Sequence, residues 1–376
     1  MRKGGAKRLK ILIAAGGSGG HIFPAIALAR TLKEERRDIE IRFLGSRKEL
    51  DKRIFEKERF RFSLISANKL PYGASARVLP FLASLFFDLV KTFFITAAYR
   101  PGVVVGFGGY VSFPAILTAR IFGIPRLVHE QNVVPGRANK ALFRLADKAA
   151  LSFEHTKKYL EKGTEKKAVL TGNPIRREML KGDRLFGIRR FGLLASKFTI
   201  LVIGGSQGAH VLNEKFIEAI SLIDEGARSS MQVIHITGIK DYEWATKEYS
   251  MIGKPDHRVY SFIDRIEEAY SAADLIVTRA GASAIFEIAA FGKAMILVPY
   301  PFAMSHQSEN AREFSANNAA IEIEEKGLSG EVFKDNILSL INNRARLEDI
   351  GESAGRLAVP EASNNLAKEV MSLGEK

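Results

Sequence analysis

A glycine-rich turn followed by a histidine is the feature of this sequence best suited to chemistry. Residues 10–24 read KILIAAGGSGGHIFP, in which residues 11–15 predict a strand, residues 16–20 a turn and residues 24–33 a helix, with His21 at the helix start. Glycines let the main chain approach a ligand closely, and the unpaired N–H groups of a helix start suit a phosphate or a developing oxyanion. A histidine there could act on whatever the turn holds.

Two common nucleotide-binding motifs do not fit this turn. The dinucleotide fingerprint requires a third glycine where Ile22 stands, and a P-loop requires Lys-Ser/Thr where His21-Ile22 stand. The turn alone therefore predicts an anion or a sugar near a strand end. A purely structural strand-to-helix turn, capped by the histidine, is an equally open interpretation.

Two further strands of the first half end in polar or glycine-rich residues. Residues 103–110, VVVGFGGY, repeat the pattern of strand and glycine turn and precede a predicted helix at 114–122. The strand at 126–129 leads into the polar run His129-Glu130-Gln131-Asn132. In an open α/β sheet the ligand lies beyond the carboxyl ends of the strands. We therefore expect residues 16–21, 106–110 and 129–132 to line one crevice.

The second half of the chain starts a new α/β pattern. Residues 171–176, TGNPIR, interrupt the regular elements, and Pro174 prevents a ladder or helix from continuing. New strands then lead into the glycine turn GGSQGA at 204–209 and into RAGAS at 279–283, each followed by a helix. We predict an α/β fold with two Rossmann-like, doubly wound domains facing a cleft. The expected boundaries are residues 1–174, residues 175–355 and a C-terminal helix, 356–376, returning to the first domain.

Composition and charge restrict the function classes. The 376 residues are 46% hydrophobic and 26% charged, as in soluble globular proteins, and the absence of cysteine favours a cytoplasmic location. Residues 1–174 hold 32 Lys and Arg against 14 Asp and Glu, a net charge of +18, whereas residues 175–376 carry −4. Such a basic half favours an anionic membrane surface. Nucleic acid is not an expected partner because no nucleic-acid-reading motif is present.

Residues 79–99 form the most apolar stretch of the chain and permit two interpretations. Asp88 and Lys91 make a membrane-spanning helix unfavourable. A polar stripe at helical spacing leaves a wide apolar surface, which either packs in the core or lies on lipid with Lys69, Arg77 and Arg100 meeting headgroups. The residues expected on this surface are Leu82, Leu85, Phe86, Leu89 and Phe93, with Phe94 beside them. Residues 49–61 predict a charged, solvated helix.

Seven motifs, in their order along the chain, resemble the MurG family of peptidoglycan glycosyltransferases, which have the GT-B fold. They are GGSGGH, GFGGYVS, HEQN, TGNPIR, GGSQGA, RAGAS with Glu287, and His306-Gln307. The resemblance implies an inverting hexosyltransferase that moves N-acetylglucosamine (GlcNAc) from its UDP donor to the C4 hydroxyl of the muramyl sugar of lipid I, forming lipid II. It also implies peripheral attachment to the cytoplasmic face of the membrane and partners among cell-wall synthesis proteins.

The resemblance implies that the second domain binds the donor. The main chain of Ile263 would face uracil, Glu287 would accept hydrogen bonds from the ribose hydroxyls, and Ser206 with the following helix start would hold the diphosphate. Arg176, in the segment 171–176 between the two predicted domains, would contact the phosphates. A solvated Glu287 and a surface Arg176 are the simpler alternatives. The implied donor-binding residues are Ser18, Gly19, Gly20, Asn132, Arg176, Ser206, Gln207, Ile263, Ala282, Ser283, Ala284, Ile285, Phe286, Glu287 and Gln307.

The first domain would then bind the acceptor. The attacking alcohol must lose its proton, so a general base is needed, and histidine titrates in a suitable range. His21 is the first candidate, with His129 and Glu130 as rivals. The implied acceptor-binding residues are Gly108, Gly109, Tyr110 and Asn139. No cofactor and no essential metal are expected, because a helix N-terminus can stabilise the departing UDP.

Two other functions fit the same pattern. One is a UDP-sugar transferase that acts on another membrane lipid such as diacylglycerol, and the other is a non-catalytic module that binds nucleotide sugars at a membrane. Three residues depart from the family pattern. Ser18 stands where threonine is common, and Ser305 stands where an acid is common before His306-Gln307. Phe113 replaces a usually small residue after GGYVS, and the expected consequence is a narrower acceptor cleft.

Overall fold

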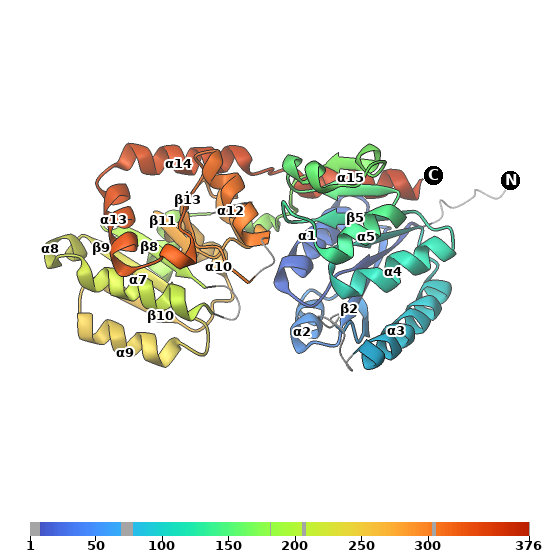
Figure 1. Cartoon of the computed structure of the whole chain (residues 1–376), viewed down its shortest axis with the longest axis horizontal. Helices are drawn as coiled ribbons and strands as arrows, with labels where there is room; N and C mark the ends of the chain where they lie inside the picture. Colours follow the sequence, from blue (N-terminus) through green and yellow to red (C-terminus); the bar gives the residue numbers. More distant parts are fainter. Residues whose placement is uncertain (1–7, 69–77, 181, 205–207, 303–305, 376) are drawn as a thin grey trace. The chain divides into compact units, whose positions relative to one another are not determined.

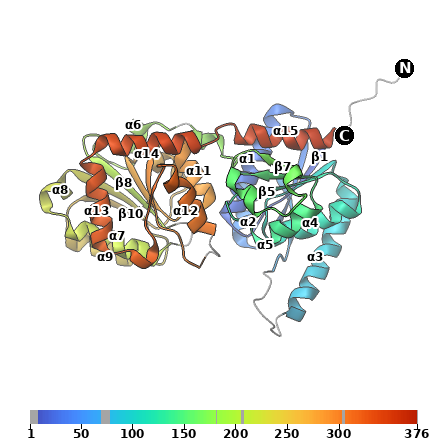
Figure 2. The ribbon, with the colours of Figure 1, turned by 45° about the horizontal axis from the view of Figure 1, so that its top comes forward.

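The structure, a computed structural model, describes residues 8–68, 78–180, 182–204, 208–302 and 306–375 (Figure 1). The chain divides into two compact units, one formed by residues 1–176 with 361–376 and the other by residues 177–360. Each unit contains one parallel sheet with helices on both faces (Figures 1 and 2). The predicted α/β class with two doubly wound domains is therefore confirmed.

The first unit is built on a seven-stranded parallel sheet with the order β3-β2-β1-β4-β5-β6-β7. Its strands are β1 Lys10–Ala14, β2 Glu40–Ser46, β3 Arg61–Ile65, β4 Val103–Gly106, β5 Arg126–Glu130, β6 Lys148–Leu151 and β7 Ala168–Leu170. Its helices are α1 Gly19–Glu35, α2 Glu49–Lys57, α3 Val78–Tyr99, α4 Gly109–Ile121, α5 Arg137–Leu145 and α15 Ala362–Gly374. Short 3₁₀ turns cover Glu154–Tyr159 and Glu165–Lys167.

The side chains of β1 alternate between the two faces of the sheet, and all of the apolar ones are buried, so both faces must be covered by helices. Ile11 and Ile13 belong to a core cluster with α1, α2 and α15, whereas Leu12 and Ala14 belong to a second cluster with α3, α4 and α5. Successive strand residues point to opposite faces, so a continuous apolar strand is buried only when both faces are covered. The last helix of the chain, α15, packs on α1 and β4, as predicted for the returning C-terminal helix.

The second unit contains a six-stranded parallel sheet with the order β10-β9-β8-β11-β12-β13. Its strands are β8 Phe198–Ile203, β9 Met231–Ile236, β10 Asp256–Tyr260, β11 Leu275–Thr278, β12 Ala294–Leu297 and β13 Ile321–Glu322. Its helices are α6 Arg184–Arg190, α7 His210–Leu222, α8 Glu225–Ser229, α9 Tyr242–Ile252, α10 Ile266–Ala272, α11 Ala282–Ala290, α12 His306–Ala316, α13 Gly330–Ile341 and α14 Arg344–Leu357. Short 3₁₀ turns cover Arg177–Leu180 and Glu325–Gly327.

Two helices begin one turn or more before the predicted start. The prolines at 24 and 114 suggested helix starts, because proline favours the first turn, but α1 begins at Gly19 and α4 at Gly109. Ile22 and Val111, which precede these prolines, are buried in the core. Burial of these side chains extends each helix back into its glycine turn, so the glycines themselves form the first helical turn.

Helix α3 buries Asp88 and Thr92 of its polar stripe and exposes its apolar face, which excludes the interpretation of an ordinary core helix. Asp88 is 4% exposed and its carboxylate accepts the backbone N–H groups of Ser66 and Ala67, both at 2.8 Å. Phe86 and Phe87 are 61% and 68% exposed. Within the described residues, α3 is long and apolar enough to cross a bilayer by length and composition. Figure 2 shows its N-terminal end projecting from the unit.

The apolar residues of α3 differ in their exposure. Leu85 and Leu89 are partly buried, whereas Leu82, Phe86 and Phe93 are exposed. The exposed apolar face, as the structure defines it, therefore consists of Leu79, Leu82, Phe86, Phe87, Val90, Phe93 and Phe94. Of the basic residues expected beside it, Arg100 is exposed at the end of the helix, and Lys69 and Arg77 lie outside the described residues.

Candidate functional site

The three strand ends singled out in the first half lie together in the structure. β1, β4 and β5 are neighbours in the sheet, so their carboxyl ends meet at one edge. The Gln131 side chain donates a hydrogen bond to the Phe107 carbonyl, at 3.1 Å, which ties the run after β5 to the turn after β4. Gly109 has φ of +70° and lies so close to His21 that a Cβ atom there would be 3.3 Å from the imidazole Nδ1. This conformation and this space both favour glycine.

The imidazole of His21 is held above the first glycine turn. Its Nδ1 lies 3.3 Å from the Gly16 carbonyl and 3.5 Å from the Ser18 hydroxyl. A carbonyl oxygen only accepts, so this contact places the proton on Nδ1 and leaves Nε2 able to take a proton. Removal from water lowers the pKa of His21, and the charges of Glu130 and Asp51 partly oppose this shift. Ser18 precedes α1, and Gly19 and Gly20 form its first turn with His21.

Asp51 supports the glycine turn, a role that the sequence interpretation missed. The expectation of a solvated helix is wrong for this residue, which is fully buried on α2. Its carboxylate accepts hydrogen bonds from the Gly17 N–H at 2.9 Å, the Ser46 N–H at 2.8 Å and the Ser46 hydroxyl at 2.7 Å. The one available signal was its position four residues before Phe55, because residues at this spacing share a helix face.

Replacing Asp51 by alanine is expected to lower the free energy of unfolding by about 3 kcal/mol or more, because two backbone N–H groups and a hydroxyl lose their acceptor in a buried place. Chemical denaturation measures this loss. Glu49→Ala, at an exposed position on the same helix, serves as the control and should change stability little. Equal stability of the two variants would contradict the anchoring role.

Glu130 is a structural acceptor in this arrangement. Its carboxylate accepts from the backbone N–H and the side-chain amide of Asn132, both at 3.0 Å, from the Gly136 N–H at 3.1 Å and from the Asn139 amide at 2.8 Å. Asn139 is itself buried and also donates to the His129 carbonyl. Four donors hold Glu130, so the carboxylate fixes the loop that carries Asn132.

His129 is buried, and both of its ring nitrogens have partners. Nε2 lies 3.1 Å from the Gly172 carbonyl, and Nδ1 lies 3.0 Å from the Gln131 amide nitrogen. Because the carbonyl must accept and the amide must donate, the proton is on Nε2 and Nδ1 accepts. Burial lowers the pKa of His129 to about 4. This histidine therefore connects the β5 end to the loop after β7.

The pKa of His129 predicts acid sensitivity of the fold. Between its usual value of about 6.5 and about 4, the unfolded chain binds a proton that the folded chain does not. The stabilisation is therefore fully present above pH 6.5 and is lost as pH falls through this range, by an amount on the order of 3 kcal/mol. Denaturation at pH 7, 6 and 5 should show a steeper decline for the wild type than for His129→Gln. Parallel declines would contradict this assignment.

In the second unit, the candidate residues lie at the starts of α11 and α12. Residues 282–286 form the first turns of α11, and Glu287 follows them on the same helix with its side chain largely buried. The Asn310 amide on α12 donates to the Ala280 carbonyl at 3.2 Å, which joins the two helix starts. The Gln307 side chain accepts from the Tyr300 N–H at 3.0 Å. Side chains of α12 thus hold the loop after β11, through Asn310, and the loop after β12, through Gln307.

A buried arginine, Arg279, also connects the loops after β11 and β12, and it was not among the predicted site residues. The Arg279 guanidinium lies 2.5 Å from the Glu325 carboxylate and donates to the Val298 carbonyl at 3.2 Å. It also lies over the ring of Tyr300, 5.5 Å from the centroid. Arg279 connects the turns after β11 and β12, and a charged residue directly after a buried strand was the signal for it.

The remaining predicted residues are less informative. Ile263 is partly exposed in the loop after β10, at the edge of the sheet. The Arg176 guanidinium lies over the Phe23 ring, 4.5 Å from its centroid, within the first unit. Ser206 and Gln207 lie outside the described residues. In the parts of the chain that the structure describes, no group of three or more His, Asp or Glu residues could hold a metal ion.

Comparisons with known proteins give one consistent result. The profile of the glycosyltransferase family 28 N-terminal domain matches residues 11–151, and that of the family 28 C-terminal domain matches residues 199–366. A protein of Geobacter sulfurreducens is 38% identical over 369 residues, 98% of this chain and all of the relative. A protein of Halothermothrix orenii is 35% identical, over 95% of this chain and 97% of the relative.

The names of these two relatives and the structure of a third protein point to the same family. Both proteins are named UDP-N-acetylglucosamine–N-acetylmuramyl-(pentapeptide) pyrophosphoryl-undecaprenol N-acetylglucosamine transferase. The crystal structure of Acinetobacter baumannii MurG superimposes with a TM-score of 0.75 at 27% identity, covering 97% of this chain and 99% of that one. The similarity therefore extends through both units and the last helix.

Proposed function

Because this chain belongs to glycosyltransferase family 28, we propose that it transfers GlcNAc from UDP-GlcNAc to the C4 hydroxyl of the muramyl sugar in lipid I, the undecaprenyl-diphosphate-linked acceptor, and so forms lipid II. The observation that carries this proposal is the similarity, over nearly the full length, to relatives named for that transfer. The chain is a glycosyltransferase, and the proposal concerns its two substrates.

In the proposed reaction, the acceptor hydroxyl attacks the anomeric carbon of GlcNAc from the face opposite to UDP. The C4 oxygen forms the new glycosidic bond, the bond to the UDP oxygen breaks with its electron pair, and the hydroxyl proton passes to a base of the enzyme. UDP leaves with additional negative charge. Positive charge at the leaving group therefore stabilises the transition state, and this task is assigned to Ser206 and the start of the following helix, α7, because helix N-termini carry unpaired N–H groups.

His21 is the preferred base among the three candidates. Its Nε2 is the free proton acceptor of a neutral imidazole, since Nδ1 faces the Gly16 carbonyl. The ring nitrogens of His129 are used by Gly172 and Gln131, and the Glu130 carboxylate is occupied by four donors. These bonds favour structural roles for the two rivals. The buried Asn139 donates to the Glu130 carboxylate and to the His129 carbonyl, which favours a structural role for Asn139 as well.

The donor would bind to the second unit. Glu287 follows the first turns of α11, and its carboxylate is suited to accepting hydrogen bonds from two ribose hydroxyls. Gln307 and Asn132 are assigned to the sugar of the donor. Ile263 is assigned to uracil and Arg176 to the phosphates, as the family resemblance implies. No cofactor enters this scheme.

We further propose that the enzyme lies on the cytoplasmic surface of the membrane through the exposed apolar face of α3. Phe86, Phe87 and Phe94 are each more than 60% exposed, and the first half of the chain carries a large positive charge. An apolar surface together with basic residues is the combination that binds an anionic bilayer interface. This placement would bring the enzyme to an acceptor whose tail stays in the bilayer.

The double variant Phe86→Asp/Phe87→Asp is expected to reduce binding to vesicles with anionic lipids by at least about tenfold. The transfer of two exposed aromatic side chains from water into the bilayer interface contributes well over about 1.4 kcal/mol. Vesicle co-sedimentation measures the loss. Met251→Asp, an exposed apolar position on α9, is the control and should bind as the wild type does. Unchanged binding of the double variant would assign membrane attachment to another surface.

The proposed reaction is tested by incubating the protein with labelled UDP-GlcNAc and lipid I in vesicles. Formation of a labelled disaccharide lipid with an equal amount of UDP is expected. Parallel incubations with diacylglycerol vesicles test the alternative acceptor. Transfer to diacylglycerol alone would overturn the acceptor assignment, and donor binding without UDP release would overturn catalysis.

A further inference from the structure

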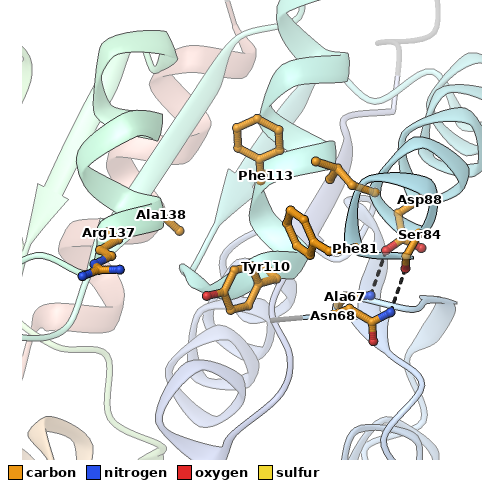
Figure 3. Close-up of a pocket in the computed structure, with 10 residues that line it drawn as sticks. Ala67, Asn68, Phe81, Ser84, Asp88, Tyr110, Phe113, Arg137 and Ala138 are labelled. Atoms are coloured by element: carbon orange, nitrogen blue, oxygen red, sulfur yellow. Dashed lines mark hydrogen bonds between the residues drawn. The ribbon is translucent and has the colours of Figure 1, made fainter. Parts of the chain in front are cut away.

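A pocket in the first unit separates the glycine turn after β4 from the exposed face of α3. Its volume is about 210 Å³ (Figure 3). It is formed by the first half of α3, the start of α4, the start of α5 and the loop after β3. The residues that line it are Ala67, Asn68, Phe81, Ser84, Leu85, Asp88, Tyr110, Phe113, Arg137 and Ala138.

The side chains that can contact a ligand in this pocket are mostly apolar. The rings of Phe81, from α3, and of Tyr110 and Phe113, from α4, lie between Ala138 and Asp88 in the view of Figure 3. The polar groups on the α3 side have partners within the fold: Asn68 donates to the Ser84 hydroxyl at 2.8 Å, and the Asp88 carboxylate accepts two backbone N–H groups. Such a lining suits hydrocarbon and has few groups to offer a sugar or a peptide.

The position of the pocket relates it to the proposed acceptor site. Tyr110 directly follows Gly109, and Gly109 lies against the imidazole of His21. On the other side, Phe81 and Leu85 belong to α3, whose outer face carries Phe86 and Phe87. A ligand that extends from the candidate base to the membrane-facing helix would therefore pass the pocket. Arg137, an exposed cation at the start of α5, lies at the end of the pocket away from Asp88 (Figure 3).

We propose that this pocket binds the isoprenoid segment next to the diphosphate of the lipid-linked acceptor, with Arg137 facing the diphosphate. The inference rests on the proposed function, because it requires a polyprenyl diphosphate acceptor. An apolar cavity of about 150 Å³ accommodates a benzene ring, so about 210 Å³ has room for one or two branched five-carbon units. The remaining tail would continue along α3 into the bilayer. Phe113, the bulky residue in place of a usually small one, is assigned the role of contacting this segment.

The test fills the pocket by substitution and removes the isoprenoid from the acceptor. Ala138→Phe places a ring in the pocket, and Ala141→Phe places the same ring at an exposed position of the same helix, α5. Two soluble acceptors are compared without vesicles or detergent, the muramyl-pentapeptide diphosphate with a two-unit prenyl ester and the same compound with a methyl ester. Membrane binding does not enter this comparison.

We expect the wild type and Ala141→Phe to show a KM about tenfold lower for the prenyl acceptor than for the methyl acceptor, as loss of one buried branched segment implies. In Ala138→Phe the two KM values should become equal, while the KM for UDP-GlcNAc is unchanged. Phe113→Ala, which removes ring contacts with the isoprenoid, should reduce the ratio as well, and it decides the result if Ala138→Phe does not fold.

Two outcomes separate the inference from the function on which it rests. Equal preference for the prenyl acceptor in the wild type, Ala138→Phe and Phe113→Ala would overturn the pocket assignment while leaving the transferase function in place. Absence of transfer to either acceptor by the wild type, with transfer to another lipid, would overturn the proposed function itself and the inference with it.

Discussion

Substitution of His21 by alanine is expected to lower kcat by about 10²- to 10⁴-fold, the usual contribution of a general base, with little change in the affinity for UDP-GlcNAc. The physical reason is local. The Gly16 carbonyl accepts from Nδ1, so Nε2 has the lone pair that can take the proton from the attacking hydroxyl. Single-turnover kinetics with saturating donor and acceptor, together with donor binding by calorimetry, measure the two quantities.

The pH dependence provides a second measurement of the same role. The pKa of His21 is lowered by removal from water, and a base acts only when it is neutral, so kcat/KM should stay constant down to pH 6.5 and fall below it as the imidazole is protonated. This acid limb should be absent from His21→Ala. His155→Ala, at an exposed position of the same unit, is the control. A lost donor affinity with normal kcat in His21→Ala would refute the assignment.

Replacement of Glu287 by glutamine is expected to weaken UDP-GlcNAc binding by about 10- to 150-fold and to change kcat at saturating donor much less. A hydrogen bond to a charged group contributes about 1.5–3 kcal/mol, and each 1.4 kcal/mol is a factor of ten in affinity. The amide keeps the shape of the side chain on the buried side of α11 but removes the charge. Calorimetric titration with UDP-GlcNAc measures the loss.

An altered donor shows whether this loss concerns the ribose. UDP-GlcNAc with a 2′-deoxyribose should bind the wild type more weakly, whereas Glu287→Gln should distinguish the two donors much less, because the partner of the missing hydroxyl has been weakened. Glu214→Gln, exposed on α7, is the matched control. If Glu287→Gln discriminates as strongly as the wild type, the carboxylate does not contact the ribose.

The alternation of strands and helices along the sequence predicted the two parallel sheets. Each strand, turn and helix could be recognised from its own residues, without knowledge of distant contacts. Apolar strands followed by glycine turns and helices recur in both halves, and parallel strands joined by helices must be covered on both faces. The same rule correctly predicted that the turns after β1, β4 and β5 meet at one edge. The helix starts were placed too late, because burial of Ile22 and Val111 outweighed the preference of proline for the first turn.

Charged side chains on helices were the weaker part of the prediction. Asp51 was assigned to a solvated helix, yet it is fully buried and anchors Gly17 and Ser46. Asp88 is similarly buried against the loop after β3. Whether a carboxylate faces water or a backbone N–H depends on segments distant in the chain, and the pattern within a single helix contains no information about them.

The sequence by itself determined the order of the elements, the two sheets and the residue types that gather at the strand ends, since these follow from periodicity and from glycine at the turns. The tertiary structure alone decided which polar side chains are engaged. It left Nε2 of His21 as a proton acceptor, whereas Glu130 and His129 form hydrogen bonds with the surrounding loops. It also turned the apolar face of α3 outward and formed a pocket behind it. These outcomes depend on contacts between residues far apart in sequence, where burial and hydrogen bonding compete for the same side chain.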